Sequence, residues 1–230
     1  MSIWIDLWEL LFPRCCVVCG ERLSKSEEFL CFKCLASLPR TRLHERAGNE
    51  MEKNLWGKLP IERASAFLFY IKGGKVRKLL YELKYYHNPK IGHFLGRCMA
   101  AELKPSGFFS GIDYIIPVPL HGKRERKRGY NQSALLADGV AAVVGCPVLC
   151  DVIVRTCYTE SQTRKSYYER WVNVRDVFEY VPTTSLEGKH ILLLDDVFTT
   201  GATIVACADA LRQVPKLRIS VLALALASDD

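Results

Sequence analysis

The sequence lacks any run of about 18 apolar residues, although 49% of its 230 residues are hydrophobic, so we expect no transmembrane helix. Its first residues, MSIWIDLWELLFPRCC, lack a basic start and a small-residue cleavage site, which argues against a signal peptide and favours the cytoplasm. There is no internal repeat and no low-complexity segment. The GGK at residues 73–75 lacks the rest of a P-loop, which argues against ATP hydrolysis. The composition is otherwise that of an ordinary globular protein, and the chain is long enough for one core and an appendage.

The segment at residues 191–203, ILLLDDVFTTGAT, carries the clearest chemistry. Its apolar run fits a strand buried on both faces, as in a parallel sheet. Asp195 and Asp196 would then lie at the carboxyl end of the strand, where open α/β sheets bind ligands. A helical pattern begins at Ala202, and a helix start favours an anion because its N–H groups are unpaired. Two carboxylates that can bind hydroxyls, next to a turn that can bind a phosphate, suit a sugar phosphate as the ligand.

This segment resembles the motif with which type I phosphoribosyltransferases bind 5-phosphoribosyl-1-pyrophosphate (PRPP). The resemblance implies a catalytic, ribose-binding role for Asp195 and Asp196. Purine-salvage members usually carry an Asp at the position of Thr199, so the obvious general base near an acceptor is missing and purine salvage is disfavoured. The alternative is an Asp-rich turn with Thr as a helix cap. By resemblance, the phosphate contacts are Thr199, Thr200, Gly201, Ala202 and Thr203.

Five of the ten cysteines fall between residues 15 and 34. The two C-x2-C pairs have the spacing of a four-thiolate zinc site, because each tight turn aims two sulfurs at one ion. Four thiolates complete a tetrahedron, so the expected zinc is structural. Cys15 is an alternative to Cys16, and four unrelated cysteines are the ordinary alternative to a site. The expected ligands are Cys16, Cys19, Cys31 and Cys34.

The LFPRCCVVCG near the N-terminus, the CFKC at 31–34 and the motif at 191–203 together resemble the ComF family of bacterial proteins linked to DNA uptake in natural transformation. The resemblance covers nearly the whole chain, including residues 117–137 and 161–178. It implies a type I phosphoribosyltransferase fold, a mostly parallel α/β sheet flanked by helices, with a small N-terminal zinc-finger module. We expect the module in residues 1–40, a linker in 41–60 and the phosphoribosyltransferase-like domain in 61–230.

Apolar runs and helical spacing alternate along the rest of the chain, as a parallel α/β sheet requires. Strands are expected at 64–71, 114–116 and 219–227, the second ending near Ile116 because proline cannot donate within a ladder. Helical spacing is found near 76–83, 91–99 and 135–143. The first of these helices has a basic side that is either a solvated face or a contact for phosphates, formed by Lys75, Arg77, Lys78 and Lys84.

A strongly basic stretch, KRERKRGYNQ at 123–132, follows the second strand. A solvated loop is its ordinary interpretation. In the family that the sequence resembles, the preceding turn approaches the pyrophosphate, whose charge is best neutralised by fixed N–H groups and basic side chains. This implies a backbone loop at Val118 and Pro119, with Arg124 and Arg128 as charge partners.

The polar stretch 155–173 falls where type I phosphoribosyltransferases carry a flexible hood that excludes water from the reacting ribose. The candidate hood residues are Ser161, Gln162 and Arg170. A connecting loop is the alternative.

Two functional hypotheses follow from the resemblance. The first is an enzyme that binds Mg2+–PRPP, with the magnesium held mainly by pyrophosphate, ribose and water, and with an acceptor that the sequence does not name. The second is a non-catalytic protein of the competence machinery. It would bind single-stranded DNA through aromatic side chains that stack on bases next to basic side chains, such as Tyr85 with Lys84. Alternatively, it would recruit a helicase or recombination protein. The net charge of +7 permits a polyanionic partner, and a homodimer is common among the enzymes resembled.

Overall fold

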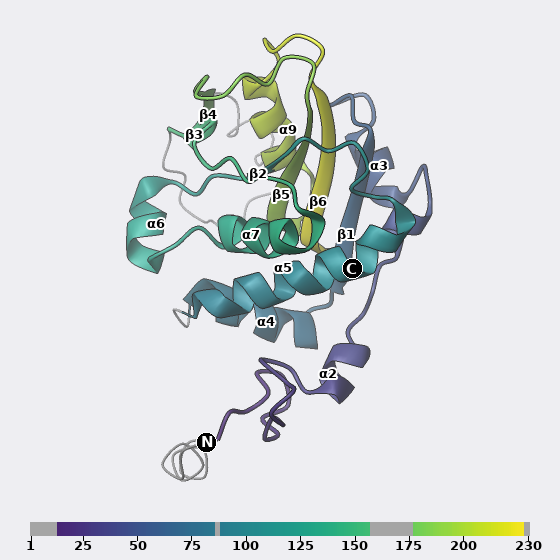
Figure 1. Cartoon of the computed structure of the whole chain (residues 1–230), viewed down its shortest axis with the longest axis vertical. Helices are drawn as coiled ribbons and strands as arrows, with labels where there is room; N and C mark the ends of the chain where they lie inside the picture. The colour runs from purple at the N-terminus through teal and green to yellow at the C-terminus, as the bar shows by residue number, and fades with distance from the viewer. Residues whose placement is uncertain (1–12, 86–87, 157–176, 228–230) are drawn as a thin grey trace.

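The computed structural model describes residues 13–85, 88–156 and 177–227. Within these ranges, the main sheet has four strands in the order β1-β6-β5-β2, all paired in parallel (Figure 1). The predicted parallel α/β sheet is therefore confirmed. Its strands are β1 (Arg63–Tyr70), β2 (Tyr114–Pro117), β5 (His190–Phe198) and β6 (Arg218–Ala227).

The two central strands are nearly continuous apolar runs because both of their faces are covered. Alternate residues of β5 and β6, such as Leu192 and Leu222, pack with the helices of one face, while Leu193 and Val221 pack with the elements of the other. β2 runs one residue further than predicted, to Pro117. It lies at the edge of the sheet, and proline is tolerated there at the end of a strand.

Helices cover both faces of the sheet and complete a three-layer architecture (Figure 1). One face carries α4 (Lys75–Tyr85), α5 (Pro89–Leu103) and α7 (Gln132–Val144), and the other carries α3 (Glu50–Leu55) and α9 (Ala202–Ala210). A small antiparallel sheet of β3 (Ile153–Arg155) and β4 (Phe178–Tyr180) lies beside α9.

Glycines let α5 and α7 approach very closely. A Cβ at Gly96 would lie 2.2 Å from the carbonyl oxygen of Leu136, and one at Gly139 would lie 2.3 Å from that of His93. Distances this short exclude any side chain at either position. The contact fixes α7 against α5, and α7 in turn packs on β2 and β5.

Part of the segment predicted as a linker is folded against the sheet. It forms η1 (Leu43–Glu45) and α3, and both contact β1. Asn49 caps α3 by accepting from the N–H groups of Met51 and Glu52, and its amide donates to the carbonyl of Ala64 at 2.8 Å. Met51 and Leu55 are fully buried, one helical turn apart. The domain boundaries at residues 40 and 60 stay predictions.

The cysteine-rich segment packs on α4 and α5 through a core shared with the sheet (Figure 1). It includes α2 (Phe32–Ala36). Lys78 donates to the carbonyl of Val18 at 2.6 Å, and Lys75 donates to the hydroxyl of Ser37 at 2.5 Å. The basic side of α4 is therefore in part a docking face for this segment.

Two further helices connect these elements, η2 (Lys104–Ser106) and α6 (Gly122–Arg128). The KRERKR stretch is helical and not a loop, because His121 caps its start and Gly129 ends it with a φ of 86°. None of the helices in the described ranges combines the length and the apolar character that a membrane span needs.

Candidate functional site

Asp195 and Asp196 lie at the carboxyl end of β5 with 8% and 6% of their surface exposed. The hydroxyl of Ser133, at the start of α7, donates to Asp195 Oδ1 at 3.1 Å, and the backbone N–H of Asp196 donates to the same oxygen at 2.8 Å. Lys84, in the last turn of α4, places its Nζ 2.6 Å from Asp196 Oδ2. Three elements thus meet at the acid pair.

The environment of Asp195 favours its protonated form. Burial and the negative charge of Asp196 raise the pKa of Asp195 to about 7. The Asp196 N–H, the Lys84 ammonium and the Ser133 hydroxyl act in the opposite direction, because each stabilises the carboxylate. Asp195 therefore carries less than a full negative charge near neutral pH.

The turn after β5 depends on the absence of a side chain at Gly201. This residue has a φ of 77° and caps the start of α9. A Cβ there would lie 2.9 Å from Phe198 Cζ and 3.0 Å from Leu55 Cδ2, so α3 packs directly beneath the turn. Thr200 is buried and its hydroxyl accepts from the N–H of Ala202 at 3.4 Å, whereas Thr199 is exposed. The turn thus presents a helix start next to the acid pair.

The turn after β2 lies beside the acid pair because β2 and β5 are neighbours in the sheet. The N–H of Val118 donates to the carbonyl of Leu194 at 2.8 Å, one residue before Asp195. Asn131, which caps α7, donates to the carbonyl of Val118 at 3.0 Å. The half-buried Pro119 follows. The contact of this turn with pyrophosphate stays a prediction.

The two arginines predicted as charge partners both lie on α6. Arg128 donates to Gln132 Oε1, and its guanidinium carbon lies 5.7 Å from the ring centroid of Tyr85. Arg124 is half-buried on the same helix. Tyr130 donates to the carbonyl of Leu83 at 2.9 Å, which ties the start of α7 to the end of α4.

The hood candidates Ser161, Gln162 and Arg170 lie outside the described residues, so their role stays a prediction. Sequence reasoning missed Ser133 as a partner of Asp195 and Leu55 as a support for Gly201. Both contacts join residues distant along the chain, and only the fold brings them together. A weak signal for Ser133 was its place just inside a helix cap, after Asn131.

The four predicted metal ligands converge. The sulfurs of Cys16, Cys19, Cys31 and Cys34 all lie within 4.8 Å of one another. Cys15 is exposed, contacts the carbonyl of Pro13 and is not a member of this group, which decides between Cys15 and Cys16. Four thiolates around one point suit a tetrahedral zinc ion.

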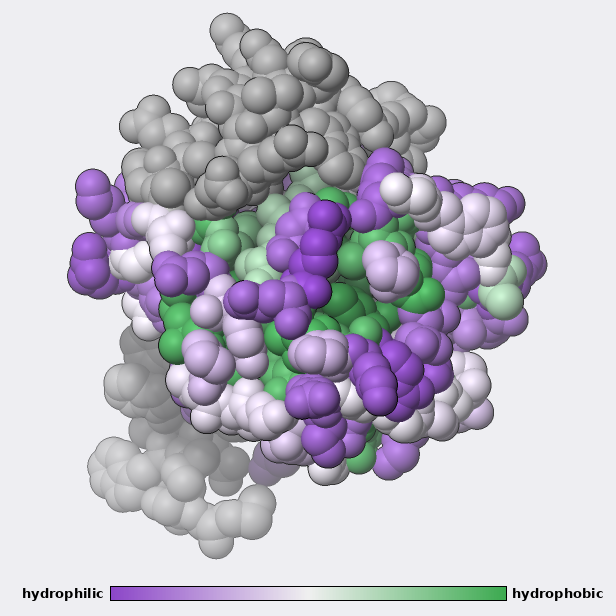
Figure 2. All heavy atoms as spheres, turned by 90° about the horizontal axis from the view of Figure 1, so that it is seen from above, coloured by the Kyte–Doolittle hydropathy of each residue, from purple (hydrophilic) through white to green (hydrophobic). Residues whose placement is uncertain are grey.

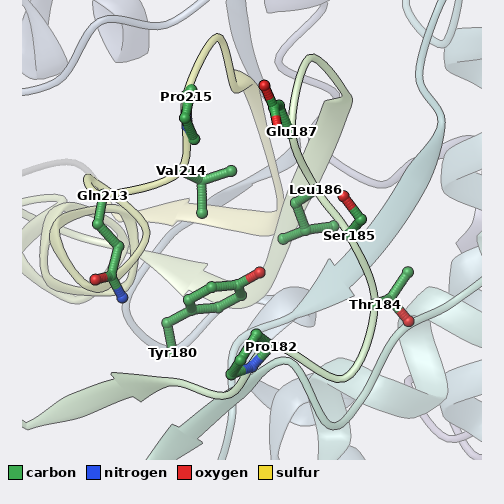
Figure 3. A pocket seen from close by; sticks show the side chains of 9 residues that line it. All are labelled: Tyr180, Pro182, Thr184, Ser185, Leu186, Glu187, Gln213, Val214 and Pro215. Carbon is green, nitrogen blue, oxygen red and sulfur yellow. The ribbon is translucent and has the colours of Figure 1, made fainter.

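A cavity of about 510 Å³ lies at the amino-terminal ends of β5 and β6, the opposite end of the strands from the acid pair. Tyr180, Leu186 and Val214 point toward one another there, with Ser185 and Glu187 nearby (Figure 3). Seen from above, the molecule shows apolar side chains between hydrophilic ones (Figure 2). No group in this cavity belongs to the predicted site.

Known proteins resemble the chain at the level of sequence. DNA utilization protein YhgH of Escherichia coli O157:H7 is 30% identical over 199 residues, which are 85% of this chain and 83% of that protein. Competence protein F of Haemophilus influenzae is 34% identical over 114 residues, 49% of this chain and 50% of its own. No family model matches the chain.

The chain belongs to the ComF family. The resemblance predicted from its cysteine pairs and its acidic motif is confirmed. Among solved structures, an adenine phosphoribosyltransferase is similar over 63% of this chain and 74% of its own, with 17% identity and a TM-score of 0.42. In this ComF protein, a single helix touches both candidate sites, since α4 contacts the cysteine segment through Lys78 and the acid pair through Lys84.

Proposed function

We propose that this ComF protein binds PRPP with Mg2+ at the carboxyl end of β5. The observation that carries the proposal is the placement of Asp195 and Asp196 near the carboxyl end of β5, which leads into a turn whose glycine has positive φ and opens α9. Carboxylates accept hydrogen bonds from hydroxyls, and the unpaired N–H groups of a helix start bind a phosphate. PRPP offers ribose hydroxyls and a 5-phosphate on one ring.

The proposed reaction is a phosphoribosyl transfer to an acceptor that stays open. The bond between ribose carbon 1 and the pyrophosphate oxygen breaks, its electron pair leaves with pyrophosphate, and the acceptor's nucleophile bonds to carbon 1. Arg124 and Arg128, on the helix that follows the turn at Val118 and Pro119, would compensate the departing charge. The Val118 N–H is already donated to the carbonyl of Leu194 and Pro119 has no N–H, so the arginines carry this part of the proposal. Magnesium bound to pyrophosphate oxygens would supply further charge neutralisation.

Zinc is the proposed resident metal of the N-terminal segment. Its role is structural, because Cys16, Cys19, Cys31 and Cys34 would fill all four tetrahedral positions and leave none for a substrate.

The proposed biological setting is the handling of DNA. Support comes from the names of the relatives, a DNA utilization protein and a competence protein. Binding of PRPP and a link to DNA uptake are compatible, because a protein that handles DNA can also use PRPP as a substrate or signal.

Calorimetric titration of the zinc-loaded protein with PRPP and Mg2+ tests the site. Asp196→Ala removes the hydroxyl acceptor and should abolish binding, with the circular dichroism spectrum unchanged. Asp209→Ala is the matched control, since this aspartate lies on α9 but pairs with Arg212 at the surface, and it should bind like the wild type. Absence of binding to the wild type would overturn the proposal.

A second candidate function, binding of single-stranded DNA, is favoured by an exposed aromatic pair on α4. Tyr81 and Tyr85 are 52% and 57% exposed, with ring centroids 4.8 Å apart, and Arg128 lies over Tyr85. Such rings stack on bases beside a cation. Tyr85→Ala should weaken binding of a fluorescent oligonucleotide, and charge reversal at Arg128 should reduce its salt dependence. Unchanged affinity in both variants would contradict this function.

A further inference from the structure

The ammonium of Lys84 is paired with the carboxylate that the hydroxyls of the proposed ligand would contact. It lies 2.6 Å from Oδ2 of Asp196, with side chains that are 25% and 9% exposed. Within the described residues, that oxygen is buried and has no hydrogen-bond partner besides this ion pair. The carboxylate proposed to bind ribose is therefore neutralised within the protein itself.

A ligand that binds Asp196 in place of Lys84 must supply a donor to the carboxylate and also leaves the ammonium in need of a new counter-charge. A hydroxyl can replace the ammonium as donor to the carboxylate, but a partly buried ammonium left without a counter-charge is costly. A neutral diol brings no such charge. A diol with an anionic group beside it brings both, a donor for Asp196 and an acceptor for Lys84.

We propose that Lys84 makes the site selective for sugars that carry an anionic group near the diol, by moving from Asp196 to that group when the ligand binds. The inference rests on the proposed function and adds a residue to it. PRPP meets the condition, because its pyrophosphate is attached next to the 2-hydroxyl. Lys84 is thus a binding residue whose ligand-free partner is the acid pair.

The rest of α4 is anchored, so the movement belongs to the side chain. The carbonyl of Leu83 accepts from Tyr130, and Lys75 and Lys78 hold the other end of the helix on the cysteine segment. Leu79 and Leu83 are fully buried beneath it. A lysine has a flexible four-carbon stem and a charge that can turn between two oxygens without moving its backbone.

The opposite role is also physically possible and gives a sharp alternative. If Lys84 only blocked Asp196, its removal would relieve a competitor and the ligand would bind more tightly. If it transfers to the ligand, its removal weakens binding. The direction of the change separates the two.

The experiment is calorimetric titration with Mg2+–PRPP of the wild type, Lys84→Met, Lys84→Arg and Arg77→Met. Lys84→Met should weaken binding by about ten- to a hundredfold, the range of a hydrogen bond to a charged group. Lys84→Arg should restore most of the affinity, because it keeps the charge. Arg77→Met is the control for net charge, since Arg77 lies exposed on the same helix.

Titration with inorganic pyrophosphate supplies a second readout. Its affinity should fall in Lys84→Met and should not fall in Asp196→Ala, since pyrophosphate has no diol. Equal or tighter PRPP binding by a folded Lys84→Met would overturn the inference while leaving the PRPP site intact. Absence of PRPP binding to the wild type would overturn the proposed function instead, so the two failures are distinguishable.

Discussion

Asp195 is a buried acid, and it makes the stability of the protein depend on pH. Its pKa rises from 3.8 to about 7, so the folded chain binds this proton more tightly than the unfolded chain. Linkage then gives a stabilising contribution that is fully present below about pH 4 and is lost as the pH rises to about 7. Asp195→Asn keeps an acceptor for Ser133 but removes this titration.

We therefore expect the free energy of unfolding of Asp195→Asn, relative to wild type, to rise by about 1–4 kcal/mol between about pH 5 and about pH 8. Urea denaturation of both proteins across this range measures the difference. Parallel pH profiles would show that Asp195 does not hold its proton in the folded state.

At the scale of elements, the turn between β5 and α9 depends on its glycine. Gly201→Ala introduces both a left-handed alanine and contacts of 2.9 and 3.0 Å with Phe198 and Leu55. Gly145 is a matched control, because it has a φ of 76° with nothing within 4 Å of its Cβ position. Both substitutions carry the backbone cost of about 1–2 kcal/mol, and only Gly201→Ala should add a clash and weaken PRPP binding. Equal destabilisation with full binding in both variants, in thermal melts and calorimetry, would contradict this account.

Elements of strong periodicity were predictable from the sequence, and weakly patterned ones were not. The runs in β5 and β6 and the stripes of α4, α5 and α7 indicated their structure directly. In contrast, α3 has only Met51 and Leu55 to bury, in a segment that is otherwise polar. The basic helix α6 has no buried residues, so its sequence lacks the apolar periodicity that would predict a helix. The residue types of the acid site could be predicted from the sequence. Its partners Ser133 and Lys84 could not, because they are distant along the chain and only strand order and helix packing bring them to the acid pair.

At the scale of the whole molecule, the cysteine segment is part of one core. Buried residues run from Leu30 and Cys34 to Leu79 and Phe94 without a break. We therefore expect removal of bound zinc by a chelator to lower the melting temperature of the whole protein by about 5 °C or more, in one transition. Differential scanning calorimetry tests this, with Cys31→Ser as the control that should be insensitive to chelator. A separate low-temperature transition with the main one unmoved would mean that the segment folds independently.

The central claim is that PRPP binds across the acid pair and the start of α9. The most direct measurement is a crystal structure of the zinc-loaded protein with Mg2+–PRPP. The account predicts the 5-phosphate at the Thr199–Thr203 turn, the ribose hydroxyls on Asp196, and the Lys84 ammonium turned toward the pyrophosphate. Ligand density elsewhere, or an unchanged Lys84–Asp196 pair at ligand concentrations that saturate binding in calorimetry, would contradict it.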